Sequence, residues 1–140
     1  MVRNSLVAVV LFLFLAACAV PQKQLDSNPA YASHQYSSSD AEISWKTEKI
    51  GNALRIDGTV TNVRTSYVYD GLELEASILD AQGNVIAKQT HNFRPLKFSG
   101  TEPFQMTIPL EVGMEPEQIR FNYRYGIDED RFSVKFQSRL

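Results

Sequence analysis

The sequence predicts an all-β protein whose domain, residues 41–140, is a single antiparallel sandwich of about seven strands. Two observations lead to this fold class. From residue 41 onward, apolar and polar residues alternate in short runs, as in strands that bury one face and expose the other. Clusters of Gly, Asn, Asp, Ser and Pro separate the runs, as turns do. No run has the apolar spacing of an amphipathic helix.

The predicted strands follow one another at short intervals. The first contains Ile43 and Trp45, and the fourth runs from Val85 to Phe93. The inward positions of the other five are Leu54, Ile56, Gly58, Val60 and Asn62; Leu72, Leu74, Ala76 and Ile78; Phe104, Met106, Ile108 and Leu110; Ile119, Phe121, Tyr123 and Tyr125; and Phe132, Val134 and Phe136. Seven short alternating strands in about one hundred residues indicate an immunoglobulin-like sandwich.

Turn residues divide these runs. They are Gly51-Asn52, residues 80–84, Ser99-Gly100, Pro116 and residues 126–130. We expect Gly83 to adopt a positive φ, Asp80 to accept hydrogen bonds from the backbone that follows it, and Asn62 to cap the end of its strand. The segment from Phe93 to Phe98 contains Pro95, which disfavours an inner strand, so we expect it to cross between the sheets.

Composition limits the classes of function. The 140 residues have a formal net charge of −2 and no block of like charge, so the sequence predicts no binding of nucleic acid and no electrostatic attraction to anionic lipid head groups. Cys18 is the single cysteine, which excludes an internal disulfide and a cysteine-based metal site. Stability must therefore come from an apolar core. The inward aromatic residues expected in that core are Trp45, Phe104, Phe121, Phe132 and Phe136.

The N-terminal segment has the parts of a secretory signal. Arg3 provides a short basic start, and residues 6–15 are apolar. The sequence Leu15-Ala16-Ala17-Cys18 resembles the bacterial lipobox, at which a cysteine thiol is acylated and the preceding peptide is removed. Residues 1–17 are therefore expected to be a lipoprotein signal peptide. Ordinary secretion with nearby cleavage and an uncleaved anchor are the alternatives.

The lipobox resemblance implies that Cys18 carries a diacylglyceryl group on sulfur and a further acyl chain, such as palmitate, on its new amino group. Two or three acyl chains hold a protein on a membrane durably, whereas one chain binds only marginally. Ala19 stands where many enteric lipoproteins retained in the inner membrane have aspartate, which favours the outer membrane, facing the periplasm, with surface export as an alternative. A transmembrane span is disfavoured, because residues 6–20 as a helix reach about 22 Å of a roughly 30 Å hydrocarbon core.

Residues 18–40 are predicted to be the lipidated cysteine and a flexible tether. From Ala19 to Asp40 the sequence is rich in Gln, Ser, Asn, Ala and Pro and has no helical or alternating period. A coil of this length has a root-mean-square span of about 25 Å. We therefore expect the domain to begin near Ala41 and to stand clear of the lipid head groups.

The segment from Ile56 to Met106 resembles the FxLYD domain and related bacterial immunoglobulin-like domains. The matching residues are Gly58-Thr59-Val60-Thr61-Asn62, then Ile78-Leu79-Asp80-Ala81-Gln82-Gly83, then Gly100 and Phe104. The tyrosine of the family pattern is missing between Leu79 and Asp80, and Ser99 replaces its proline. These are turn and core residues, so the resemblance implies a fold and transfers no catalytic residue.

The sequence predicts no enzyme activity, no catalytic residue, no metal ligand and no cofactor. His34 lies in the predicted tether and His91 in a strand, and they lack the spacing of a metal-binding pair. No serine or cysteine has the sequence context of a catalytic nucleophile. Asp128-Glu129-Asp130 lacks the ligand spacing of a calcium loop and favours a hairpin turn.

Glu73 and Glu75 share one face of a predicted strand. Paired catalytic acids require a cleft and a raised pKa. An exposed acidic stripe is the ordinary interpretation of such a pair, and it can face Arg120 or Arg124 across strands.

Tyr67 and Tyr69 are the candidate partner-binding residues. They lie in Ser66-Tyr67-Val68-Tyr69-Asp70, between the second and third predicted strands. Loops at the ends of sandwiches often carry binding sites, and tyrosine offers a large contact area with little loss of rotamer entropy. The alternative is that one tyrosine packs over the end of the sandwich and the other lies on its surface.

Together these features predict a membrane-anchored, periplasm-facing lipoprotein that acts as a non-catalytic interaction or envelope-assembly module. Its expected partners are the membrane, through the acyl chains on Cys18, and another envelope protein. The sequence predicts no oligomeric state. A binder of small ligands or carbohydrate is the alternative, and it requires an exposed aromatic pair on one sheet.

Overall fold

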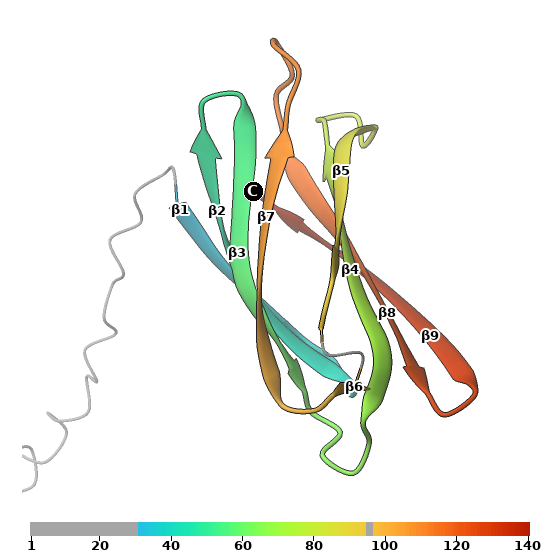
Figure 1. Ribbon diagram of the computed structural model, residues 1–140. Helices are drawn as coiled ribbons and strands as arrows, with labels where there is room; N and C mark the ends of the chain where they lie inside the picture. Colours follow the sequence, from blue (N-terminus) through green and yellow to red (C-terminus); the bar gives the residue numbers. More distant parts are fainter. Residues whose placement is uncertain (1–30, 95–96) are drawn as a thin grey trace, which may run out of the picture.

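A computed structural model describes residues 31–94 and 97–140, which form two antiparallel sheets packed face to face (Figure 1). This architecture confirms the predicted all-β sandwich. None of the described residues belongs to a helix long and apolar enough to cross a membrane. The predicted signal peptide 1–17, the lipidation site Cys18 and residues 19–30 of the predicted tether lie outside the described residues.

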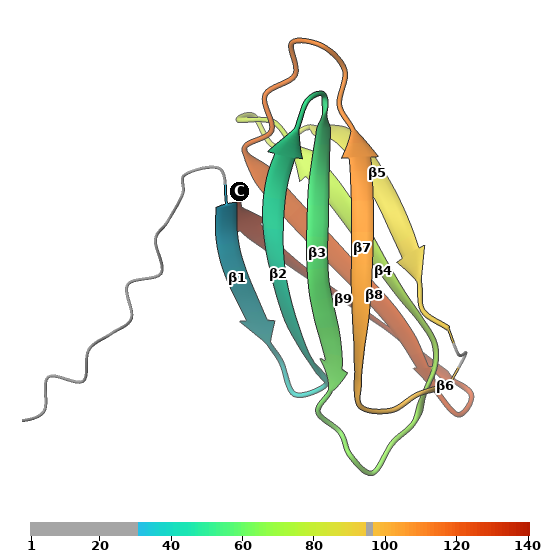
Figure 2. The same ribbon diagram turned by 60° about the vertical axis from the view of Figure 1, so that its left-hand side comes forward.

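Four strands form sheet A, in the order β1-β2-β3-β7, and five form sheet B, in the order β5-β4-β8-β9 with β6 beside β4 (Figure 2). The strands of sheet A are β1 (Tyr31–Ser37), β2 (Ala41–Ile50), β3 (Ala53–Asn62) and β7 (Thr101–Pro109). The strands of sheet B are β4 (Tyr69–Leu79), β5 (Val85–Asn92), β6 (Lys97–Phe98), β8 (Gln118–Ile127) and β9 (Asp130–Arg139).

The seven predicted strands correspond to β2, β3, β4, β5, β7, β8 and β9. β6 is a two-residue strand within the segment predicted to cross between the sheets. It pairs with β4, so the chain is still in sheet B at Phe98 and reaches sheet A only where β7 begins at Thr101, which places the crossing after the predicted segment. β1 corrects the predicted tether, because Tyr31–Ser37 pairs with β2 along its whole length. The domain therefore begins at least ten residues before Ala41.

The core lies between the sheets and follows the predicted alternation. Trp45, Phe104 and Phe121 are buried as expected. Phe136 is half-buried and stacks on Tyr36 of β1 with ring centroids 3.8 Å apart. Phe132 departs from the prediction, because its side chain is 39% exposed near the free end of the β8–β9 hairpin.

The predicted turn chemistry is confirmed at Asp80 and Gly83. Gly83 has a φ of 82°, and the carboxylate of Asp80 accepts hydrogen bonds from the backbone N–H groups of Gln82 (2.9 Å) and Asn84 (2.8 Å). Hydrogen bonds from the Asn84 side chain and backbone lower the pKa of Asp80. These contacts close the hairpin between β4 and β5.

The strand register shows that the start of β1 and the loop that joins β3 to β4 lie at opposite ends of the sandwich. Tyr31 pairs with Glu48, so it lies beside the β2–β3 turn. We call this the entry end; Leu110, which bonds to Asn52, lies there too. The opposite, far end carries the β1–β2 turn and residues 63–68, which join β3 to β4 at the lower edge of Figure 1.

Gly58 is required by a close approach within the core. A Cβ atom at this position would lie 2.3 Å from the backbone oxygen of Ser44 and 2.6 Å from the ring of Phe104. We expect Gly58→Ala to lower the free energy of unfolding by about 1–3 kcal/mol, because the packed ring and strand must shift. Urea denaturation measures this loss. Thr59→Ala, at the neighbouring exposed position, is the control and should stay within about 0.5 kcal/mol of wild type; equal effects of the two variants would contradict the packing.

Candidate functional site

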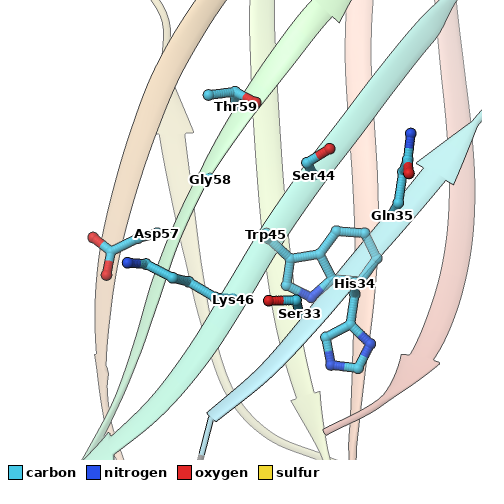
Figure 3. A pocket seen from close by; sticks show the side chains of 9 residues that line it. All are labelled: Ser33, His34, Gln35, Ser44, Trp45, Lys46, Asp57, Gly58 and Thr59. Atoms are coloured by element: carbon cyan, nitrogen blue, oxygen red, sulfur yellow. The ribbon is translucent and has the colours of Figure 1, made fainter. Parts of the chain in front are cut away.

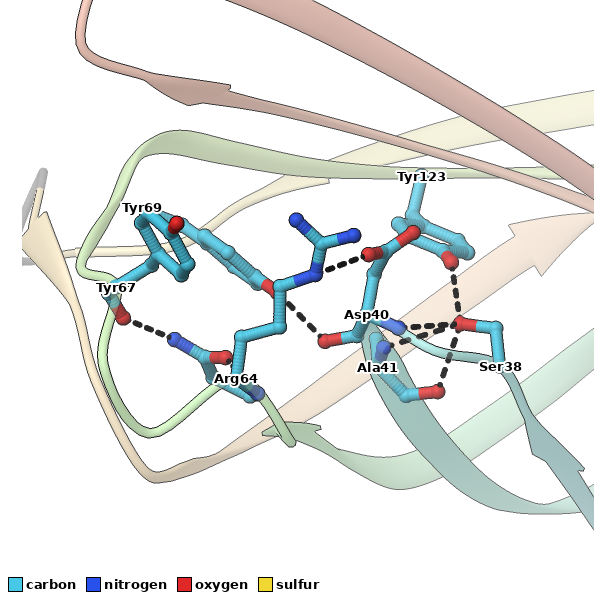
Figure 4. A network of polar contacts seen from close by, with 8 residues as sticks. Ser38, Asp40, Ala41, Arg64, Tyr67, Tyr69 and Tyr123 are labelled. Atoms are coloured by element: carbon cyan, nitrogen blue, oxygen red, sulfur yellow. Dashed lines mark hydrogen bonds and ion pairs between the residues drawn. The ribbon is translucent and has the colours of Figure 1, made fainter.

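The loop of residues 63–68 is held in one conformation by Asn62, as its predicted capping role requires. The Asn62 side-chain oxygen accepts a hydrogen bond from the Arg64 N–H (2.8 Å), and its amide nitrogen donates to the Tyr67 carbonyl (2.8 Å) (Figure 4). Asn62 is buried, so each of these bonds satisfies a group that water cannot reach.

Asp40 fixes the same loop from the β1–β2 turn. Its carboxylate forms an ion pair with Arg64 (2.6 Å), and its backbone carbonyl accepts a hydrogen bond from the Val63 N–H (3.2 Å). The Arg64 guanidinium carbon lies 5.9 Å from the centroid of the Tyr67 ring, within the range of a cation–π contact. The loop is therefore pre-formed and carries one aromatic ring on its outer side.

Tyr69 is part of the core and not of the surface. Its side chain is 1% exposed, its ring centroid lies 4.3 Å from that of Tyr125, and its hydroxyl donates a hydrogen bond to the Asp40 carbonyl (2.7 Å). Burial, together with the nearby charge of Asp40, raises the pKa of Tyr69 to about 12. The prediction that Tyr69 contacts a partner is therefore wrong, because the irregularity of β4 between Asp70 and Glu73 turns this side chain inward.

Tyr67 lies on the surface, so the two tyrosines divide as the alternative interpretation expects. Its side chain is 47% exposed, and Val63 and Val68 of the same loop are also exposed. Three large apolar side chains thus face solvent within six residues at the far end. A role of Tyr67 in binding stays a prediction.

A hollow of about 620 Å³ lies on sheet A over β1, β2 and β3 (Figure 3). Its lining residues are Ser33, His34, Gln35, Ser44, Trp45, Lys46, Asp57, Gly58 and Thr59. Trp45 is 4% exposed, and its indole N–H has no hydrogen-bond partner among the described residues. The His34 ring stacks on Trp45 at 5.2 Å and contacts the Ser138 hydroxyl through Nδ1 (3.2 Å). Sequence reasoning missed this hollow because it placed His34 in the tether.

The ionisable groups of this hollow do not form an acid–base pair. Burial lowers the pKa of His34. Partial burial opposes the ionisation of Asp57, but hydrogen bonds from Gln105 (2.6 Å) and Arg55 (3.2 Å) outweigh it and lower the Asp57 pKa. Asp57 is therefore a carboxylate at neutral pH, and the hollow offers this charge and polar side chains for binding.

The acidic residues singled out in the sequence occupy structural positions. Glu73 pairs with Arg124 (3.0 Å), one of the two arginines expected to face it. Residues 128–129 form the turn of the β8–β9 hairpin, with Asp128 at a φ of 55°. The described residues contain no group of three or more His, Cys, Asp or Glu side chains that could hold a metal ion. His91 packs on the ring of Phe93 at 4.7 Å.

No family model and no curated protein sequence matches the chain. Among solved structures, the GAE domain of GGA2p from Saccharomyces cerevisiae is 13% identical with a TM-score of 0.47; the match covers 78% of this chain and 96% of that domain. A β-glucuronidase from glycoside hydrolase family 2 is 11% identical with a TM-score of 0.46; the match covers 79% of this chain and 11% of the glucuronidase. Both TM-scores are below 0.5, so neither similarity supports an inference about function.

Serine variants separate the two tyrosines. We expect Tyr69→Ser to lower the free energy of unfolding by about 3–5 kcal/mol, because it leaves a cavity beside Tyr125 and removes a buried hydrogen bond. Tyr67→Ser should change it by no more than about 1 kcal/mol, because that ring is half exposed. Denaturant titration measures both, and a Tyr67→Ser loss as large as that of Tyr69→Ser would contradict the assignment.

Trp45 reports on the ionisation of His34. Because the folded pKa of His34 is lowered, the stability that neutral His34 contributes is complete above about pH 6.5 and is lost as pH falls through the folded pKa. Trp45 is the only tryptophan, so its fluorescence should be quenched in a step below pH 6.5 when the stacked imidazole is protonated. His34→Gln should abolish the step and His91→Gln should keep it. A step that persists in His34→Gln would rule out this coupling.

Proposed function

We propose that this protein is a lipid-anchored envelope lipoprotein that acts without catalysis as an interaction module, with the 63–68 loop at the far end as its contact surface. The observation that carries the proposal is that the N-terminal segment enters the domain at the end opposite the 63–68 loop. Tyr31, the residue through which the lipobox segment joins the domain, lies at the entry end, and Tyr67 lies at the far end.

Covalent geometry sets the reach of this arrangement. The twelve residues between Cys18 and Tyr31 can span at most about 40 Å, and a ten-residue strand adds about 33 Å. A bilayer-anchored domain can therefore present its far end at up to about 70 Å from the membrane. Acyl chains on Cys18 confine the domain to this layer, which raises its effective concentration toward other components of the same envelope. The outer membrane, facing the periplasm, is the compartment that Ala19 after the cysteine favours.

The construction of the loop supports a binding role. Asn62 and Asp40 fix its backbone before any partner arrives, so binding loses little conformational entropy. Three exposed apolar side chains within six residues supply contact area, and Tyr67 is flanked by the charged head of Arg64. An aromatic ring beside an arginine is a composition typical of interface anchors.

A binder of a small polar ligand is the second candidate. The hollow on sheet A favours it, because the side chains that face it from β1, β2 and β3 are polar or charged. The hydroxyl and amide side chains of Ser33, Gln35, Ser44 and Thr59 line the same hollow. Loss of ligand binding in Gln35→Ala or Ser44→Ala, with Tyr67→Ser unaffected, would favour this candidate over the loop.

One experiment in the native envelope tests the anchor and the loop together. A photo-crosslinking amino acid replaces Tyr67 in one variant and Val112 in the matched control, since Val112 is exposed at the entry end. We expect a discrete crosslinked protein from position 67 and none from position 112. Cys18→Ser in the same background should move the protein to the aqueous fraction and reduce the position 67 product at least about tenfold, because local concentration is lost.

The lipid anchor and the loop contact can be rejected independently of each other. Mass spectrometry of the natural protein should show an acylated Cys18, and an unmodified thiol would reject the anchor whatever the crosslinks show. An acylated protein that gives the same products from positions 67 and 112 would reject the loop as the contact surface.

A further inference from the structure

A continuous row of cations runs along the outer face of strands β8 and β9. The outward side chains of β8 are Gln118, Arg120, Asn122 and Arg124, with Gly126 at the end, and those of β9 are Arg131, Ser133, Lys135, Gln137 and Arg139. In the antiparallel register, the pairs are Gln118 with Arg139, Arg120 with Gln137, Asn122 with Lys135, Arg124 with Ser133, and Gly126 with Arg131. Each pair holds one cation and no acid, so a positive charge recurs about every 6.8 Å along the strands.

Most of this charge is uncompensated. Arg124 alone has an acidic partner among the described residues, Glu73. Arg120 donates to the neutral side chain of Gln137 (3.5 Å), and Arg131 donates to the backbone carbonyls of Asp128 (3.4 Å) and Asp130 (3.2 Å). Lys135 and Arg139 have no acidic partner in the described part of the chain. Glu73 and Glu75 of the neighbouring strand β4 face Arg124 and Asn122 of β8, so the basic surface is strongest along β9, on the side away from β4.

β9 is also an open sheet edge. Within the described residues it pairs with β8 alone, so its second row of backbone donors and acceptors has no strand partner. β8 is paired with β4 as far as Gly126, so β9 is the outermost strand of sheet B, at the lower right of Figure 1. On its inner side, Phe132 is 39% exposed and Val134 is half-buried, which leaves apolar surface uncovered. The side chains of β1 contact β9 only toward its C-terminal half, where Phe136 stacks on Tyr36 and Ser138 meets His34. The edges of β5 and β7 are more fully covered, because they lie against each other, and β7 contains Pro103 and Pro109.

We propose that β9 binds an extended segment of a partner protein by strand addition, and that this segment alternates acidic and apolar residues. Backbone pairing satisfies the free edge, and side chains that alternate between the two faces of a strand meet two different surfaces. Acidic residues on the outer face pair with Arg131, Lys135 and Arg139. Apolar residues on the inner face cover Phe132 and Val134.

An added strand of this kind accounts together for the cations, the unpaired backbone edge and the exposed apolar inner side of β9. An anionic bilayer would attract the cations but would leave the backbone edge unpaired and the apolar inner side uncovered. A second copy of β9 would bring cations against cations, and like charges on an edge strand prevent such self-pairing. The surface depends on neither the lipid anchor nor the 63–68 loop, so its test is separate from those of the proposed function.

The probe is a capped twelve-residue peptide that alternates glutamate and valine, titrated into the protein at moderate ionic strength. We expect saturable binding, with slowed amide hydrogen exchange in β9 but not in β5. Lys135→Glu should weaken binding about fivefold or more, because it reverses the central charge of the row. Lys88→Glu is the matched control, because Lys88 is exposed on the opposite edge strand of the same sheet; it should leave binding within about twofold.

Four outcomes would overturn the proposal. The first is that Lys135→Glu binds the peptide as tightly as wild type, and the second is that the peptide binds without slowing amide exchange in β9. The third is that a polyglutamate peptide of the same length binds as tightly as the alternating peptide. The fourth is that the protein binds phosphatidylglycerol vesicles through Lys135 but does not bind the alternating peptide. Thermal melting confirms that each exposed-site variant is folded before it is compared.

Discussion

Two buried tyrosine hydroxyls join the sheets at the far end, and the candidate site depends on that connection. Tyr123 and Tyr69 extend from sheet B, and their hydroxyls meet the β1–β2 turn of sheet A at the Ser38 hydroxyl (2.9 Å) and the Asp40 carbonyl (2.7 Å). Buried hydroxyls without partners are destabilising, so the turn must stay where both reach it. The Asp40 carboxylate pairs with Arg64, so the 63–68 loop takes its conformation from a core requirement.

The strands could be predicted from the sequence wherever both faces of a strand are chemically distinct. β3 and β8 alternate Leu, Ile, Val, Phe and Tyr with polar residues, and both form as expected. β1 escaped prediction because its inward residues include His34 and Tyr36, which also occur on surfaces, and its outward residues are Ser and Gln. It is ordered by pairing with β2 and by the stack of Tyr36 on Phe136, contacts that link distant parts of the sequence.

The candidate sites were less predictable because they arise from register. Strict alternation from Leu72 and Leu74 would turn Tyr69 outward. The irregularity between Asp70 and Glu73 shifts the phase of β4 and turns Tyr69 inward, and the sequence does not show that irregularity. The cation row has the same origin. Arg120 and Lys135 are fifteen residues apart, and the pairing of β8 with β9 makes them diagonal neighbours. A chain with scattered charges and a small net charge can therefore carry a basic surface that no run of sequence shows.

The loop and the strand edge differ in what a partner must do to bind them. The 63–68 loop is already fixed by Asn62, Asp40 and Tyr67 backbone contacts, so a folded partner can dock on it with little ordering. The β9 edge requires its partner to become extended, which costs conformational entropy that backbone pairing and alternating side chains must offset. Weak binding of this kind is effective mainly where local concentration is high. An anchor at the entry end would provide that concentration for both surfaces, since both belong to the one domain that the anchor holds.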